Sequence, residues 1–103
     1  MTSPLFDELV HAPARLRICA ALAPVEQASF VLLRATTELS ASALSKHLSA
    51  LAEARYVQIT KTPWDGRLRT WVALTRTGRR AYAGHITALR EIVDGPPPPA
   101  QKA

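Results

Sequence analysis

A run of hydroxyl and lysine side chains on one helical face is the stretch best suited to binding another molecule. Between positions 40 and 55, leucines recur at the four-and-three spacing of one helix face. The opposite face carries Ser42, Ser45, Lys46 and Ser49. It lacks the Glu/Lys pairs that usually solvate a surface helix, and short polar side chains let a helix approach base edges and phosphates closely. We therefore predict a DNA recognition helix here.

Three cations lie close together further along the chain. They are Lys61, Arg67 and Arg69, with Asp65 as the only acid among them. Side chains of this type neutralise phosphates, so this segment is a second candidate for contact with nucleic acid. Pro63 has no N–H to donate to a neighbouring strand, which suits the outer edge of a sheet.

The hydrophobic pattern around these cations alternates with a period of two, as in β-strands. Asp65-Gly66 is the favoured centre of a two-residue hairpin. With that centre the apolar residues pair with one another, so we expect all of them on one buried face. The expected pairs are Val57 with Leu74 and Ile59 with Val72. Trp71 then falls opposite Thr60 on the outer face, where core or dimer packing is favoured over base stacking.

Four helices are expected before the hairpin, each opened by a capping residue or a proline. They run from Ser3-Pro4 to Val10, from Pro13 to Leu22, from a Ser29 cap to Thr36 and from a Ser40 cap to Arg55, with 25–28 as a plain connection. A turn of about three residues containing apolar Leu39 joins the last two, which is the helix-turn-helix pattern. With a basic hairpin directly after it, the predicted fold is a winged helix.

The final predicted helix, 76–93, carries two adjacent apolar stripes, which together are wider than one small core needs. We infer that one stripe packs on its own domain and that the other, with the N-terminal helix, forms a two-fold dimer interface. The predicted interface residues are Leu5, Phe6, Leu9, His85, Leu89 and Ile92. A two-fold dimer would read two half-sites roughly 34–36 Å apart. Residues 1–95 then form one domain, and the Pro-rich 96–103 a disordered tail.

The charge of the chain points to a polyanionic partner. Its 103 residues carry a net charge of +5, and the pI is near 10.2. Composition alone does not separate DNA from RNA or a membrane surface. The single cysteine, Cys19, excludes an internal disulfide and fits a reducing compartment. No stretch approaches about 20 continuous apolar residues, so we expect a soluble, cytoplasmic protein with no membrane partner.

Catalytic and metal-binding patterns are not found in the sequence. The acids fall on predicted helix surfaces or turns, and neither a glycine-rich phosphate loop nor a Ser/His/acid set occurs. His11, His47 and His85 are scattered, without the close pairing that metal ligands need. We expect no enzyme, no cofactor and no metal. Cys19 fits a buried small hydrophobe better than a redox switch.

Several motifs occur in a fixed order along the chain. They are Leu44-Ser45-Lys46-His47-Leu48, Leu51, Tyr56-Val57, Asp65-Gly66-Arg67, Arg69-Thr70 and Leu74-Thr75-x-x-Gly78-Arg79. In this combination, which spans His11 to Leu89, the chain resembles the short winged-helix transcriptional regulators related to the MarR and ArsR families. The resemblance implies a bacterial DNA-binding repressor or activator that works as a homodimer on double-stranded DNA. It also allows a small-molecule effector between the dimer helices and the winged core, although no convergent polar cluster points to one.

Position by position, the resemblance implies two sets of DNA contacts. The groove-facing set is Ser42, Ala43, Ser45, Lys46 and His47, and the wing set is Arg67, Arg69 and Thr70. For Lys46 and Ser45 the alternative is an ordinary solvated face, and for His47 it is packing against the domain. The family usually has Ala-Gly-Tyr where this chain has Ala54-Arg55-Tyr56. A left-handed backbone there would make Arg55 cost roughly 1 kcal/mol that glycine would not, and any other backbone would alter the wing angle.

The sequence therefore predicts a mainly α-helical winged helix-turn-helix with a small β-hairpin and a helical dimer interface. Its predicted function is sequence-specific regulation of transcription at a palindromic operator. Two other functions fit parts of the pattern. One is a winged-helix protein-interaction module without sequence-specific DNA binding, and the other is binding to structured RNA, for which Trp64 is the candidate stacking residue.

Overall fold

Residues 5–95 are described by the structure, a computed structural model. The elements in order are α1 (Glu8–His11), α2 (Pro13–Leu22), β1 (Ala28–Ser29), α3 (Phe30–Thr37), α4 (Ala41–Glu53), β2 (Val57–Trp64), β3 (Arg67–Leu74) and α5 (Arg76–Asp94). The predicted fold class, mainly α-helical with a small sheet, is confirmed. The predicted tail at 96–103, and Ser3-Pro4 at the predicted start of the first helix, lie outside the described residues.

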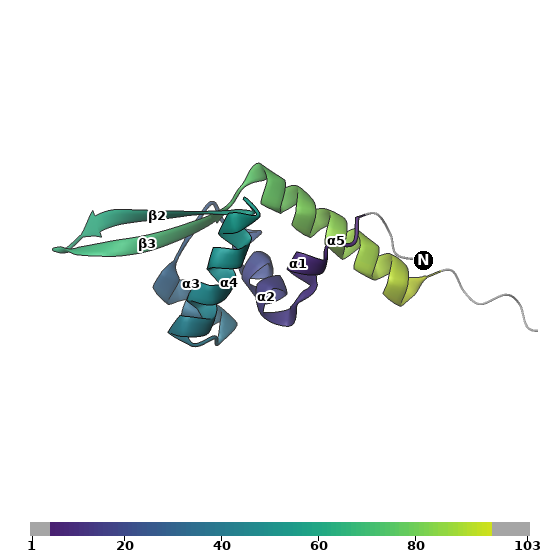
Figure 1. The fold of residues 1–103 in the computed structure, drawn as a ribbon, viewed down its shortest axis with the longest axis horizontal. Coiled ribbons are helices and arrows are strands. Elements are labelled where there is room, and N and C mark those ends of the chain that lie inside the picture. Colours follow the sequence, from purple (N-terminus) through teal and green to yellow (C-terminus); the bar gives the residue numbers. More distant parts are fainter. Residues whose placement is uncertain (1–4, 96–103) are drawn as a thin grey trace, which may run out of the picture.

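The β2–β3 hairpin and α5 extend in opposite directions from a central group of helices (Figure 1). Apolar side chains from α2, α3 and α4 meet the base of the hairpin in one core. Its fully buried members include Ile18, Leu22, Leu33, Leu44, Leu51 and Val72. The core therefore holds α4 and the base of the β2–β3 hairpin in a fixed relation, while the tip of the hairpin extends beyond the helices.

Side-chain oxygens cap the helices at the three predicted positions that the structure describes. Each accepts a hydrogen bond from the backbone N–H three residues further on, which satisfies an otherwise unpaired donor. The pairs are Ser29 with Leu32 (3.1 Å), Ser40 with Ala43 (3.1 Å) and Thr75 with Gly78 (2.9 Å). Local sequence therefore fixes where α3, α4 and α5 begin.

The first helix is shorter than the sequence predicted. α1 begins at Glu8, because the Asp7 carboxylate accepts a hydrogen bond from the N–H of Val10 at 3.0 Å and caps the helix there. Leu5 and Phe6 precede it as irregular chain rather than as helix. The prediction relied on a cap followed by a proline at the first helical position. The cap in the structure is Asp7, which lies closer to the helical residues.

The sheet has one strand more than the predicted hairpin. β1, within and just beyond the predicted connection, pairs antiparallel with β3, and the strand order is β1-β3-β2. A strand of two residues is too short to produce an alternating pattern, so the sequence gives no sign of it. The strand ties the start of α3 to the wing, since Ser29 both pairs with Trp71 and caps α3.

The register of the hairpin is the predicted one, with Val57 opposite Leu74 and Ile59 opposite Val72. Asp65 and Gly66 have φ values of 50° and 75°, as a two-residue hairpin turn requires. The expected burial of all four apolar residues is wrong for Ile59, which is 39% exposed. Ile59 instead lines a hollow between the hairpin and the helices α3 and α4, next to Phe30 and Leu48.

α5 is the longest of the described helices, with 19 residues. Gly78, His85 and Ala88 lie on its buried face. Within the described part of the chain no helix is long and apolar enough to span a membrane.

Arg55 lies in the left-handed region, with φ of 64°. The N–H of Tyr56 donates to the carbonyl of Leu51 at 2.8 Å, and that of Arg55 to the carbonyl of Ala52 at 2.9 Å. The bond that reaches back five residues, across a left-handed residue, is typical of the Schellman ending of a helix, in which glycine is preferred. The wing therefore leaves α4 by the usual glycine geometry, with an arginine in the glycine position.

We expect Arg55→Gly to raise the free energy of unfolding by about 1 kcal/mol, because glycine adopts this backbone without a Cβ clash. For a domain of this size that corresponds to roughly 4–8 °C in Tm. Arg55→Ala is the matched control, since it removes the exposed side chain but keeps the Cβ. Urea unfolding of both variants checks the expectation, and equal stability of the two would contradict it.

Candidate nucleic-acid interface

The two faces of α4 are divided as the sequence predicted. Leu44, Leu48 and Leu51 are buried. Ser42, Ser45, Lys46 and Ser49 are exposed, and Ala43 is half-buried beside them. The exposed face thus presents hydroxyls and one ammonium group, with little bulk that would keep another molecule at a distance.

Side chains of α4 and the wing line one shared hollow. Its volume is about 320 Å³, and its polar walls are Ser45 and Ser49 from α4 and Lys61 and Thr70 from the hairpin. Phe30, Leu48 and Ile59 complete the lining. The fold therefore brings together four of the residues predicted for the helix and the wing, all of them hydrogen-bond donors.

Arg67 and Arg69 lie on the other face of the hairpin. Alternation along β3 separates them from Thr70, and the register pairs Arg69 with Thr62 and Arg67 with Trp64. The Arg69 guanidinium lies 4.9 Å from the Trp64 ring centre and 5.8 Å from that of Trp71. It is held between two indoles by cation–π contacts, which stiffen the wing.

Trp71 lies on the outer face, opposite Thr60, as the register predicted. It is half-buried and is absent from the described hydrophobic core. Its indole N–H donates to the Thr62 hydroxyl at 3.0 Å, and its ring contacts Arg69. Of the predicted core or dimer packing, core packing is not what Trp71 does, since it braces the wing, and dimer packing stays a prediction.

His47 is half-buried, and its Nδ1 lies 3.2 Å from a guanidinium nitrogen of Arg15 on α2. Because arginine only donates, Nδ1 accepts, which leaves the N–H on Nε2. Burial first, and then the charges of Arg15 and Lys46, lower the pKa of His47. The neutral ring thus ties α4 to α2 and adds no positive charge to the exposed face.

A second polar cluster lies on the opposite side of the helical core. The fold brings His11 and His85 together, with Nδ1 of His11 3.1 Å from Nε2 of His85. Nδ1 of His85 accepts from the N–H of Asp7 at 3.0 Å, and the Tyr56 hydroxyl donates to the Asp7 carboxylate at 2.5 Å. That bond is the main cause that raises the pKa of Tyr56 to about 12. The histidines are therefore paired rather than scattered, although no group of three metal-ligating side chains occurs among residues 5–95.

Cys19 is fully buried near this cluster. Burial, followed by the charge of Asp7, raises the pKa of its thiol to about 11. The thiolate, which is the form that reacts, is therefore scarce near neutral pH. This placement agrees with the prediction of a small buried hydrophobe.

We expect the protein to lose stability as the pH falls below about 6.5, the usual pKa of histidine. Burial, followed by the charge of His11, lowers the pKa of His85, and its Nδ1 must stay unprotonated to accept from Asp7. The unfolded chain then binds protons at a pH where the folded chain does not, so acid favours unfolding. The slope should reach up to about 1.4 kcal/mol per pH unit for each such histidine, and His47 adds to it in the same direction.

Urea unfolding between pH 7.5 and 5.5 measures this slope. In His85→Gln the slope of stability against pH should be smaller, because one of the two histidines with a lowered pKa has been removed. An unchanged slope in this variant would show that His85 is not the group responsible.

A family model described as a winged helix DNA-binding domain matches residues 14–93. The chain belongs to this family. The matched range contains α4 and the whole hairpin, so the hollow described above lies within the winged helix domain. This is a family of DNA-binding domains, which supports the prediction that the protein is not an enzyme.

Three relatives show how far the likeness extends. An uncharacterized protein of Methanocaldococcus jannaschii is 27% identical over 85 residues, which are 82% of this chain and 92% of the relative. The structure of a transcriptional regulator homologue from Pyrococcus horikoshii has a TM-score of 0.81 and 27% identity, and covers 86% of this chain and 88% of its own. A mutant MarR from E. coli, complexed with operator DNA, has a TM-score of 0.67 and 18% identity, covering 82% of this chain and 58% of its own. The predicted resemblance to MarR-related winged-helix regulators is confirmed.

The residues predicted for a dimer interface do not share one environment in the winged helix domain. His85 is fully buried and Phe6 lies against it, with ring centres 4.6 Å apart, so His85 offers a second copy no surface in this conformation. Leu9 and Leu89 are half-buried. Leu5 and Ile92 are 51% and 59% exposed. Phe6 is itself half-buried, so all of the predicted residues except His85 leave apolar surface at or near the outside, and their contact with a second copy stays a prediction.

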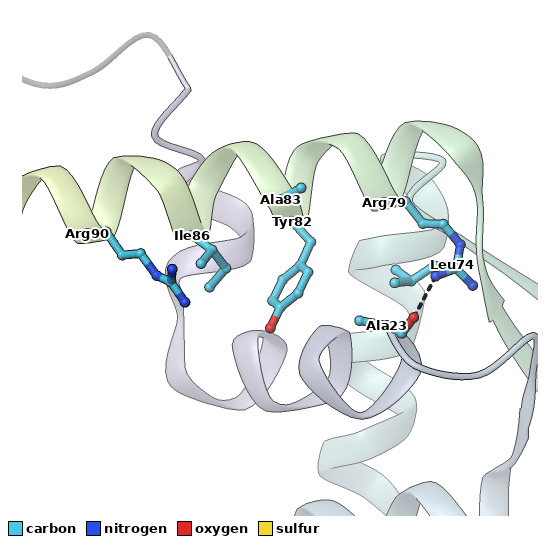
Figure 2. Close-up of a pocket in the computed structure, with 7 residues that line it drawn as sticks. All are labelled: Ala23, Leu74, Arg79, Tyr82, Ala83, Ile86 and Arg90. Atoms are coloured by element: carbon cyan, nitrogen blue, oxygen red, sulfur yellow. Dashed lines mark hydrogen bonds between the residues drawn. The ribbon is translucent and has the colours of Figure 1, made fainter.

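A groove lies beside α5, and its residues were not predicted from the sequence, although the resemblance allowed an effector between the dimer helices and the winged core. It has a volume of about 400 Å³ and lies between α5 and the end of α2 in the winged helix domain (Figure 2). Its lining residues are Ala23, Leu74, Arg79, Tyr82, Ala83, Ile86 and Arg90. Those on α5 are spaced as one helix face, which is a signal that the sequence contains but that also fits core packing.

The two arginines of this groove have different surroundings. Arg79 donates to the carbonyls of Ala23 and Val25, both at 2.8 Å, and so completes the end of α2. Arg90, at the other end of the groove, is exposed. The groove therefore combines an apolar wall with a cation at its rim.

Proposed function

We propose that this protein is a homodimeric transcriptional regulator that binds a partly palindromic DNA operator, with one winged helix domain on each half-site. The observation that carries the proposal is the hollow shared by α4 and the wing, where Ser45 and Ser49 face Lys61 and Thr70. Four donors on two rigid elements suit a surface rich in acceptors, which is what DNA phosphates and base edges offer.

The proposed roles follow from position on the two elements. Ser42, Ala43, Ser45 and Lys46, on the exposed face of α4, read base edges in the major groove. Arg67 lies at the wing tip beside the turn and reaches the minor groove or its flanking phosphates. Lys61 and Thr70 hold the backbone between them. Arg69, already held between two indoles, keeps the wing rigid and adds positive charge.

Dimerisation is proposed to use the end of α5 and the N-terminal segment. Ile92 and Val93, in the last turn of α5, are 59% and 78% exposed, and Leu5, which lies against the middle of α5 at Gly84, is 51% exposed. That end of α5 extends away from the wing (Figure 1). Apolar surface of this kind typically marks an interface. A two-fold pairing there would leave both recognition helices free to meet successive major grooves.

Selection from a random-sequence duplex library, followed by titration of the enriched duplex, tests the proposal. We expect an inverted repeat bound by two protomers. The affinity should fall on the order of 10³-fold between 50 and 200 mM salt if about six phosphates are neutralised. The absence of any enriched sequence, or binding that salt leaves unchanged, would reject the proposal.

We infer that the groove beside α5 binds a small organic anion that modulates DNA binding. Leu74, Tyr82 and Ile86 supply apolar contact, and Arg90 supplies a cation for a carboxylate. Benzoate is a suitable probe, because it joins a flat apolar ring to one carboxylate. It should raise the Tm of the wild type more than that of Arg90→Gln, and equal shifts in the two proteins would exclude this site.

A further inference from the structure

The two faces of the wing tip differ in what holds them. Alternation in the paired register places Lys61, Pro63, Leu68 and Thr70 on one face and Thr62, Trp64, Arg67 and Arg69 on the other. Lys61 and Thr70 line the hollow next to the exposed serines of α4. The face that contains Leu68 is therefore the face turned toward the recognition helix.

The opposite face is braced by its own side chains. Arg69 lies against the rings of Trp64 and Trp71, and the Trp71 indole N–H donates to Thr62 at 3.0 Å. These contacts link both strands of the hairpin from the tip toward its base. These contacts stiffen the wing. A side chain on the face that contains Leu68, here called the front face, therefore loses less conformational entropy when it binds DNA.

The front face ends in an apolar pair, since Pro63 and Leu68 are directly opposite one another. Leu68 is 68% exposed, and Pro63 is exposed as well. A hollow of about 570 Å³ lies between the wing tip and α3, with Leu68 and Val31 in its lining, so the helices do not cover the pair.

The charges around this pair indicate its partner. Lys61 shares the face of this pair, and Arg67 and Arg69, from the other face, line the same hollow as Leu68. Asp65 in the turn is the one acid between positions 57 and 74. An apolar side chain framed by cations is suited to the minor groove of DNA, where such side chains partly unstack a base step while the cations meet the phosphates.

We propose that Leu68, backed by Pro63, is a wedge that enters the minor groove beside each half-site and opens one base step there. This inference rests on the proposed function and extends it to DNA that α4 does not touch. Pyrimidine–purine steps unstack most easily, so the operator preference should include such a step on each flank. Leu68 would then determine specificity through deformation of the DNA rather than through hydrogen bonds.

The test uses the duplex enriched by selection, with 2-aminopurine at single flanking positions. Wild-type protein should raise the fluorescence at one position on each flank, because unstacking relieves the quenching of this base. Leu68→Ala should abolish that rise and weaken binding about fivefold, whereas Leu68→Met should keep both. Leu32→Ala is the matched control, since Leu32 is a 57% exposed leucine on α3, and it should behave as the wild type.

Replacing the flanking pyrimidine–purine step by a stiff A-tract distinguishes insertion of Leu68 into the base step from ordinary contact with the DNA surface. The change should weaken DNA binding by the wild type. It should not affect DNA binding by Leu68→Ala, because this variant does not open the base step. Tight, salt-sensitive binding with no fluorescence rise, or with Leu68→Ala equal to wild type, would overturn the wedge and leave the proposed function intact. The absence of an enriched duplex would overturn both.

Discussion

Gly78→Ala is expected to lower the free energy of unfolding by about 3 kcal/mol, the largest stability effect of a single methyl group in this chain. A Cβ at Gly78 would lie 2.0 Å from the carbonyl oxygen of Tyr56 and 2.8 Å from its carbonyl carbon. These are backbone atoms, so neither can rotate away. The same carbonyl accepts the N–H of Thr75 at 3.0 Å, and relieving the clash would lengthen this bond.

The position matters because three elements meet there. Thr75 donates its hydroxyl to the Arg55 carbonyl at 2.6 Å and caps α5 through the N–H of Gly78. A shift of α5 at this point would therefore disturb the exit of α4 and the base of the wing together. We expect the variant to bind DNA more weakly even under conditions where it is folded.

Gly84→Ala is the matched control on the same helix. A Cβ there would lie 3.4 Å from the nearest atom, the end of the Leu5 side chain, which is an ordinary contact. Because alanine favours helix over glycine, this variant should be neutral or up to about 1 kcal/mol more stable. Urea unfolding at pH 7 compares the two. Similar losses from both substitutions would show that the close approach at Gly78 is not what determines stability there.

Lys46→Ala is expected to weaken DNA binding by about 1–3 kcal/mol, the largest effect on affinity in the exposed face of α4. Lys46 is exposed beside Ser45, and among residues 40–53 of the recognition helix and its cap it is the one lysine or arginine. If its ammonium group reads a base, the loss should be confined to the preferred sequence. If it holds a phosphate, all sequences should weaken equally and the salt slope should fall by about 1.

Arg80→Ala removes the same unit of charge from an exposed position on α5 and serves as the control. It should change affinity only slightly, because a distant exposed charge is screened within about a Debye length. Fluorescence anisotropy on the enriched and on a scrambled duplex measures both variants. Equal losses from Lys46→Ala and Arg80→Ala would mean that the net charge, and not α4, holds the DNA.

The sequence predicts the elements of the interface well because each is determined by neighbouring residues. Ser29, Ser40 and Thr75 cap helices through bonds that span three residues, and Asp65-Gly66 sets the register of the whole hairpin. At Arg55 the family resemblance left two backbone conformations open, and the structure has the left-handed one. These features depend on short-range geometry, which the sequence contains directly.

What could not be predicted depends on residues far apart in the sequence. His11 and His85 are separated by 74 positions, and nothing in either segment indicates that they meet. The two-residue strand β1 is visible only once β3 lies beside it. The predicted register already placed Trp71 on the outer face, but the contacts of Arg69 with two indoles depend on side-chain conformations, which an alternating pattern does not contain.

Site-specific cross-linking from α4 tests most directly whether this helix reads the operator. Cys19 is the only cysteine, and it is fully buried with a pKa of about 11, so a photoactivatable reagent on Ser45→Cys should label one position. Thr87→Cys, exposed on α5, is the control. We predict cross-links from position 45 to bases in two symmetric half-sites about 10 base pairs apart, and none from position 87. Equal cross-linking from both positions, or none to bases from position 45, would contradict DNA reading by α4.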